Sequence, residues 1–355
     1  MSSVPEINMP TAAIKSVLSG LLGRKIASMK RVGSGRNSRV YRLTCEDATV
    51  YTAKSYFQNS PDRDRLGVEF SGLQFLWKNE VRCVPRPIIA DKTHGYAVYE
   101  YIDGRTIPSL KVTDSDIDYS IDFLARLKQL KSSEGSHALP AASEACFSVR
   151  GIVDNISQRL SRLQALRKDG QQYHALDEFL TGDFVPSFNE ITGWCQSNLN
   201  QSGISFTAEL PGEERTLSPS DFGFHNALRC ADGRIVFLDF EYFGWDDPAK
   251  MIADFLLHPA MRLGESLKRH FAAGILKRFA DYKFIDKRVE IVYPLFGLKW
   301  CLIFLNEFVP ELLLRRTFAS KKELDNDKLM AAQLAKARRM LHRVMNEYEH
   351  FPYRT

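Results

Sequence analysis

The sequence lacks the cysteine patterns that hold small secreted domains or zinc sites together. Six cysteines are scattered over 355 residues, and no two of them form a CxxC pair. Neither a disulfide framework nor a structural zinc site is therefore predicted. Reduced cysteines favour a reducing compartment, and we expect a cytoplasmic protein.

The chain also has little that predicts a membrane or nucleic-acid partner. Its most apolar stretch, residues 289–314, is broken by charged residues and prolines, so a buried helix is predicted rather than a bilayer span of about 20 apolar residues. The first 15 residues contain no basic region followed by an apolar stretch, which argues against a signal peptide. The 48 basic and 43 acidic residues include no dense basic run, so we expect no nucleic-acid partner and no membrane insertion.

The spacing of apolar residues changes from strand-like to helix-like along the chain. After a helical stretch at 11–22, strands are predicted at 25–33, 38–45, 48–57, 88–90 and 96–101, with a helix over 62–79 between them. Helical spacing then dominates, at 113–131, 149–167, 173–180, 188–199 and from 248 onward, apart from β-like runs within 215–243.

These patterns predict an α+β architecture with two lobes. A small lobe with an antiparallel sheet is expected over residues 1–102, and a larger, mainly helical lobe over 103–355. Sites for small molecules commonly form between such units, so the chemistry is expected between the lobes.

A glycine-rich segment lies between two of the predicted strands. Its glycines would let backbone N–H groups approach phosphate oxygens closely. A hairpin turn in which the glycines serve only the backbone geometry explains the segment equally well. A dinucleotide-binding motif is disfavoured, because a strand rather than a helix follows. The candidate phosphate-binding residues are Gly33, Ser34, Gly35, Asn37 and Ser38.

Lys54 lies inside an apolar strand-like run, where an ammonium group needs an acidic or phosphate partner. Glu69 follows fifteen positions later on the predicted helix. The alternatives are a solubilising lysine on an edge strand and a surface charge on a helix.

The segment from 217 to 245 carries the most specific signal. Asp221 and Asn226 are five positions apart, and Asp239 follows thirteen positions later at the end of an apolar strand. Two carboxylates and an amide oxygen are hard ligands of the kind that suits Mg²⁺. Roles in turns, caps and strand ends are the alternative for each residue.

Together these residues resemble the aminoglycoside phosphotransferase and choline kinase family, small-molecule kinases with the protein-kinase-like fold. Asp221 and Asn226 match its catalytic loop, and residues 239–248 match its metal-binding segment. The resemblance implies that Asp221 accepts or orients the proton of a substrate hydroxyl and that Asn226 and Asp239 bind Mg²⁺. It leaves Glu241 as a metal ligand, as a support for the metal, or as a surface residue.

The resemblance also implies a nucleotide site for ATP, with GTP as the alternative. Lys54 would hold the α- and β-phosphates, Glu69 would fix its ammonium group, and residues 33–38 would cover the phosphates. The expected hinge, whose backbone receives the base, consists of Glu100, Tyr101 and Ile102.

Three positions depart from the family pattern. Pro219 stands where the family usually has a histidine that packs and orients the loop, and Ser220 replaces the usual glycine or arginine. Ser38 stands at the third glycine of the phosphate loop. We expect the loss of the histidine to be tolerated. His225 is expected to pack within the loop, with a phosphate contact as the alternative.

The function implied is transfer of the γ-phosphate of ATP to a hydroxyl of a small molecule, such as an aminoglycoside, an amino alcohol or a sugar-like acceptor. A regulatory nucleotide-binding pseudokinase is the alternative. A protein kinase is disfavoured, because neither an APE segment nor an activation loop is evident. The sequence does not assign the acceptor. An acidic cluster either attracts an amino substrate or favours a helix N-terminus, and it consists of Asp114, Asp116, Asp118 and Asp122.

Overall fold

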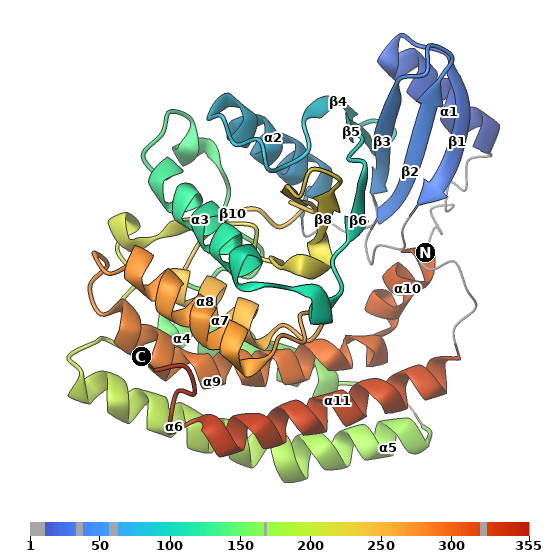
Figure 1. The fold of residues 1–355 in the computed structure, drawn as a ribbon. Helices are drawn as coiled ribbons and strands as arrows, with labels where there is room; N and C mark the ends of the chain where they lie inside the picture. The colour runs from blue at the N-terminus through green and yellow to red at the C-terminus, as the bar shows by residue number, and fades with distance from the viewer. Residues whose placement is uncertain (1–10, 33–37, 57–62, 167–168, 320–324, 355) are drawn as a thin grey trace.

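The computed structural model describes residues 11–32, 38–56, 63–166, 169–319 and 325–354, and it shows a β-sheet beside a larger group of helices (Figure 1). The sheet has five antiparallel strands in the order β1-β2-β3-β5-β4. The predicted strands are confirmed as β1 (Ile26–Val32), β2 (Ser38–Cys45), β3 (Val50–Tyr56), β4 (Pro87–Asp91) and β5 (Tyr96–Glu100).

Two helices cover opposite faces of this sheet, α1 (Thr11–Leu22) and α2 (Arg65–Lys78). Side chains alternate between the faces along a strand. Val98 of β5 therefore packs with Leu18 of α1 in a small apolar cluster, while its neighbour Tyr99 belongs to the large core that includes α2. A side chain of the sheet that faces α2 consequently points toward the rest of the protein.

Two small sheets are formed by strands that follow β5 in the chain. One has the order β6-β8-β9 and the other pairs β7 with β10. The β-like runs predicted within 215–243 are thus confirmed, whereas β6 and β10 lie where no strand is predicted. The division of the chain after residue 102 stays a prediction. The strands are β6 (Gly104–Thr106), β7 (Thr216–Ser218), β8 (Ala227–Cys230), β9 (Ile235–Phe237) and β10 (Gly244–Asp246).

Helices make up most of the remainder. They are α3 (Asp114–Leu130), α4 (Val149–Gln164), α5 (Gln171–Glu178), α6 (Val185–Gln201), α7 (Pro248–Leu257), α8 (Glu265–Arg278), α9 (Ile285–Phe304), α10 (Pro310–Ala319) and α11 (Asn326–Glu347). The separation predicted between 180 and 188 is wrong. A π-helical segment joins α5 to α6 there, because Leu180 and Phe184 face the core and are buried.

Helix α9 is the centre of the helical part and contacts α4, α6, α7 and α11. The segment Ile285–Phe308 is long and apolar enough to cross a membrane, but 83% of its apolar window is buried inside the protein. The prediction of a buried helix is thus confirmed for this segment, and the α+β architecture is confirmed for the chain.

Candidate active site

Lys54 and Glu69 form a buried ion pair between the sheet and α2. Lys54 leaves β3 on the face of Tyr56, the face that α2 covers. Its Nζ donates to Oε1 of Glu69 at 2.7 Å and to Oε2 at 2.9 Å. Lys54 is 9% exposed and Glu69 is 2% exposed, so the alternatives of an edge-strand lysine and a surface glutamate are wrong.

Asp239 brings a second carboxylate to the same ammonium group. It lies two residues after β9, and its Oδ1 accepts a hydrogen bond from Lys54 Nζ at 2.7 Å. Its φ of +69° is uncommon for a residue other than glycine, and such conformations cluster at functional sites. Burial alone would lower the pKa of Lys54, but Asp239 and Glu69 outweigh burial and raise that pKa well above its usual range.

Two further groups hold the carboxylate of Glu69 in place, and a third contacts one of them. The hydroxyl of Tyr56 donates to Oε2 at 2.6 Å, and the backbone N–H of Phe240 donates to Oε1 at 3.3 Å. The Tyr56 hydroxyl also lies 2.7 Å from that of Tyr99. Because Phe240 directly follows Asp239, the Phe240 contact ties α2 to the segment that carries the second carboxylate.

Asp221 lies in the loop after β7, with two histidines on one carboxylate oxygen. Its Oδ1 is 3.0 Å from Nε2 of His225 and 3.0 Å from Nε2 of His258. Burial favours the neutral acid, but the hydrogen bonds from both rings outweigh burial and hold the pKa of Asp221 well below its usual range. The carboxylate is therefore ionised at neutral pH. His225 packs within the loop, as expected.

Asn226 connects the Asp221 loop to the segment that leads to Asp239. Its side-chain Nδ2 donates to the backbone oxygen of Asp221 at 3.0 Å, and its backbone oxygen accepts from Leu238 N at 2.8 Å. The side-chain Oδ1 is then the atom of Asn226 that can ligate a cation. That oxygen and the carboxylate of Asp239, whose side chain is 34% exposed, are hard donors that fit Mg²⁺.

Glu241 is buried beside these groups. It is 2% exposed, and its Oε1 lies 3.9 Å from Nε of Arg65. Burial, and then the charge of Asp239, raise the pKa of Glu241 to about 8. The alternative of a surface position is therefore wrong, whereas ligation or support of a metal by Glu241 stays a prediction.

Structural contacts explain why Gly244 and Asp247 stand at their positions in the 239–248 motif. A Cβ on Gly244 would lie 2.2 Å from the backbone oxygen of Pro140, because Trp245 N donates to that oxygen at 2.9 Å. Asp247 caps α7 through Ala249 N at 2.8 Å. Arg288 binds the other oxygen of Asp247 in turn. These contacts anchor the segment that carries Asp239.

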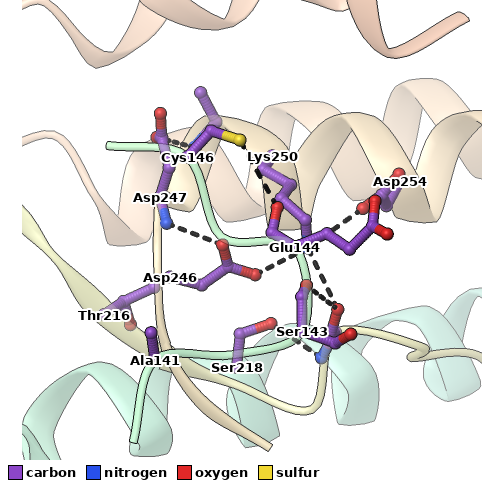
Figure 2. Close-up of polar contacts among 12 residues, drawn as sticks. Ala141, Ser143, Glu144, Cys146, Thr216, Ser218, Asp246, Asp247, Lys250 and Asp254 are labelled. Carbon is purple, nitrogen blue, oxygen red and sulfur yellow. Dashed lines mark hydrogen bonds and ion pairs between the residues drawn. The ribbon is translucent and has the colours of Figure 1, made fainter. Parts of the chain in front are cut away.

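A buried lysine supports the loop before Asp221. Lys250 Nζ donates to Asp246 Oδ2 at 2.8 Å and pairs with Asp254 Oδ2 at 3.3 Å (Figure 2). It also donates to Ser220 Oγ at 3.0 Å. Ser220 has a φ of +66°, a left-handed conformation that is costly for a residue other than glycine, so the Lys250 contact holds a strained residue next to Asp221.

The predicted hinge and phosphate loop are placed only in part. Glu100 ends β5, and its backbone N–H donates to Arg86 O at 2.8 Å, while the guanidinium of Arg42 lies over the ring of Tyr101. Ile102 is half-buried just beyond. Ser38 begins β2 and is buried. The other phosphate-loop candidates lie outside the described residues, namely Gly33, Ser34, Gly35 and Asn37.

The acidic residues of α3 contact Thr113, Arg229 and residues of α8. Asp116 completes a capping box with Thr113 and accepts from Arg229 at 2.7 Å. Asp118 contacts His270 at 2.6 Å, and Asp122 pairs with a basic residue of α8. Helix capping thus explains part of the cluster, and pairing with α8 explains the outer members.

Sequence reasoning missed His258, Lys250 and Tyr56. His258 lies 37 positions after Asp221, at the end of α7, and no local spacing links the two. Lys250 had a usable signal, because a lysine within the apolar pattern of a helix needs an acidic partner. Tyr56 could have been found from the alternation of side chains along β3, because residues two positions apart, such as Lys54 and Tyr56, lie on the same face of a strand.

A small sheet that presents a buried lysine to two carboxylates beside a helical lobe defines the class of kinase-like phosphotransferases. The chain belongs to the phosphotransferase enzyme family, whose model matches residues 28–288. No curated protein matches the chain in sequence.

Solved structures share the fold over nearly the whole chain. Choline kinase from Cryptosporidium parvum is 12% identical, with a TM-score of 0.61 over 95% of this chain and 97% of that one. Spectinomycin phosphotransferase in complex with ADP and spectinomycin is 10% identical, with a TM-score of 0.64 over 95% and 99%. Amicoumacin kinase in complex with AMP-PNP and Ca²⁺ is 15% identical, with a TM-score of 0.59 over 94% of each chain. The predictions of a bilobal kinase-like fold and of a phosphotransferase are confirmed.

Proposed function

We propose that this protein transfers the γ-phosphoryl group of ATP, with GTP as the alternative donor, to a hydroxyl of a small molecule. One observation carries the proposal. Lys54, Glu69 and Asp239 come from three distant segments and meet within hydrogen-bond distance. Phosphoryl transfer needs positioning and cancellation of phosphate charge more than covalent chemistry, and this arrangement supplies both.

In this proposal the ammonium of Lys54 binds the α- and β-phosphates. All three of its N–H groups are now directed at Glu69 and Asp239. Nucleotide binding would exchange the Asp239 contact for a phosphate contact, while the two bonds to Glu69 keep the ammonium in place. Asp239 is then free to turn to a cation.

Asn226 and Asp239 would hold Mg²⁺, with Glu241 buried behind them. Bound there, Mg²⁺ cancels charge on the phosphates of the nucleotide. ADP and AMP-PNP with Ca²⁺ occupy two proteins of the same fold, which supports a nucleotide and a divalent cation here.

Asp221 would orient the acceptor hydroxyl. The hydroxyl oxygen forms a bond to the γ-phosphorus, the bond from that phosphorus to the β–γ bridging oxygen breaks, and ADP leaves. The hydroxyl proton passes to Asp221 as the new bond forms. The low pKa of Asp221 keeps it ionised and able to accept this hydrogen bond. A cytoplasmic location, with reduced cysteines and a supply of MgATP, fits this activity.

Thermal unfolding with and without MgATP tests the nucleotide site. A ligand at 100 times its Kd stabilises the folded state by about 2.7 kcal/mol. For 355 residues the unfolding entropy is about 0.75 kcal/mol/K, so the melting temperature should rise by about 4 °C.

Asp239→Asn should lose most of this rise. Asp232→Asn is the matched control, because Asp232 is exposed and lies in the same hairpin segment. No rise in the wild type at saturating MgATP would contradict the proposal. A rise without transfer to choline, spectinomycin, amicoumacin or any other acceptor would instead support the regulatory alternative.

A further inference from the structure

His258 is an unassigned partner of the Asp221 carboxylate. It is the residue that ends α7, 37 positions beyond Asp221. Its Nε2 lies 3.0 Å from Oδ1 of Asp221, and its side chain is only 11% exposed. Packing of α7 against the loop, rather than proximity in the sequence, brings the two together.

The hydrogen bonds of His258 define which nitrogen carries its proton. The backbone N–H of Ala260 donates to Nδ1 at 3.2 Å, so Nδ1 is the acceptor. In a neutral imidazole the other nitrogen then carries the hydrogen. Burial lowers the pKa of His258 below its usual range and so favours the neutral ring. Nε2–H is therefore directed as a donor at Asp221.

The ring of His258 is fixed on both sides. It stacks on the ring of His225 with 4.0 Å between centroids and 8° between planes. It meets the ring of Trp300 edge to face at 4.7 Å. The Trp300 indole donates to Asp254 at 3.0 Å, and Asp254 pairs with Lys250. A chain of contacts thus joins His258 to the lysine that holds the residue before Asp221.

We propose that His258 is a positioning residue that holds Oδ1 of Asp221 and leaves Oδ2 for the acceptor hydroxyl. This inference rests on the proposed function. Pro219 has no side chain that could orient Asp221, and His258 supplies an orienting contact from beyond α7. His225 lies on the same oxygen, and the two rings together limit rotation of the carboxylate away from the in-line path. The loss of His258 should therefore act on turnover rather than on nucleotide binding.

A metal site is the competing explanation for the same three side chains. Asp221, His225 and His258 offer ligand atoms within 4.8 Å of one another. A histidine ligates a metal through a nitrogen without a proton, usually while its other N–H donates to a neighbour. His258 shows the reverse, because Ala260 N–H donates to its Nδ1. A hydrogen bond to Asp221 therefore accounts for its Nε2 better than a metal does.

Two variants separate the effect of losing the hydrogen-bond donor of His258 from the effect of losing its ring. His258→Phe keeps a ring against His225 and Trp300 but removes the donor, whereas His258→Gln keeps an N–H near the position of Nε2. In an assay of MgATP turnover, His258→Phe should lower kcat by about 10- to 100-fold and leave KM for MgATP within about 2-fold of the wild-type value. His258→Gln should recover most of the lost kcat. His270→Gln is the control, because His270 also contacts an aspartate but lies on α8.

¹⁵N NMR of the histidine side chains measures directly which nitrogen of His258 carries the proton. The wild type should show His258 as the neutral Nε2–H form, with a shift that moves in Asp221→Asn. An Nδ1–H form, or signals that Asp221→Asn leaves unmoved, would overturn the proposal. A melting-temperature rise with Zn²⁺ alone, seen in the wild type and lost in His258→Phe, would also overturn it in favour of a metal site.

The outcomes distinguish this proposal from the proposed function. If Asp221→Asn abolishes turnover and His258→Phe turns over like the wild type, only the role of His258 is refuted. If Asp221→Asn retains full turnover, or the wild type does not turn over MgATP at all, the proposed function fails and the role of His258 fails with it.

Discussion

Replacing Lys250 by methionine should destabilise the protein in a way that depends on pH. Lys250 is 2% exposed and its partner Asp246 is fully buried. Breaking a buried ion pair by removing one partner costs about 3–5 kcal/mol, because the other charge stays buried. Among the described residues, Asp246 would keep the N–H of Asp247, at 3.0 Å from its Oδ1, as a hydrogen-bond donor.

Protonation of Asp246 limits this cost and sets its pH range. Burial already raises the pKa of Asp246 against the opposing charge of Lys250. Without the lysine, burial is no longer opposed by the charge of Lys250, so the folded-state pKa of Asp246 rises further above its unfolded value. The folded state then binds more protons than the unfolded state, so stability falls as pH rises. The deficit relative to the wild type should therefore grow as the pH rises from about 4 toward neutral.

Urea or thermal unfolding between pH 4 and pH 8 measures this deficit. With an unfolding entropy of about 0.75 kcal/mol/K for 355 residues, Lys250→Met should lower the melting temperature by about 4 °C at pH 7. Adding Asp246→Asn should remove the pH dependence and recover part of the stability. Lys268→Met is the control, because its partner Glu265 is 61% exposed and such pairs contribute little. A deficit in Lys250→Met that does not change with pH would refute the reasoning.

Three further predictions concern other contacts. Asp116→Ala removes a capping-box residue and the partner of Arg229. Urea unfolding should therefore show a free energy of unfolding about 1–2 kcal/mol lower than that of the wild type, with unchanged MgATP turnover. A decrease below about 0.5 kcal/mol would contradict the role of this cap. Lys299 and Arg159 outweigh the burial of Glu144 and lower its pKa to about 2, so the free energy of unfolding should fall as the pH drops from about 4.5 to 2. The fall should be about 1 kcal/mol, because the Glu144 side chain is 34% exposed and solvent screens the pair. Glu144→Gln should reduce this loss of stability at low pH, and a loss as large as in the wild type would contradict the role of Glu144. Removing Mg²⁺ with EDTA should abolish the rise in melting temperature with ATP, and a rise that persists would argue against a cation at Asp239.

The elements that carry strong periodicity were predictable from the sequence. The strands around Lys54 and the helix of Glu69 follow from apolar spacing. The demand of a buried ammonium predicted an acidic or phosphate partner for Lys54, and the family resemblance implied that Glu69 is that partner. The order of Asp221, Asn226 and Asp239 predicted that they share one site, and the structure connects them through the backbone of Leu238.

What the sequence could not show depends on tertiary packing. His258 reaches Asp221 only because α7 packs against the loop, and a histidine at a helix end has no pattern that names its partner. The outer aspartates of α3 were also ambiguous, since their partners lie more than 150 positions away on α8. β6 was missed because its residues, Gly104–Thr106, include no apolar side chain that could show a strand pattern.

Transfer of labelled γ-phosphate from MgATP to the small-molecule fraction of a cell extract tests the central claim most directly. The account predicts a labelled product in the non-protein fraction with the wild type and none with Asp221→Asn, while both proteins bind MgATP. Label found only in protein, or equal labelling of small molecules by the wild type and Asp221→Asn, would contradict it.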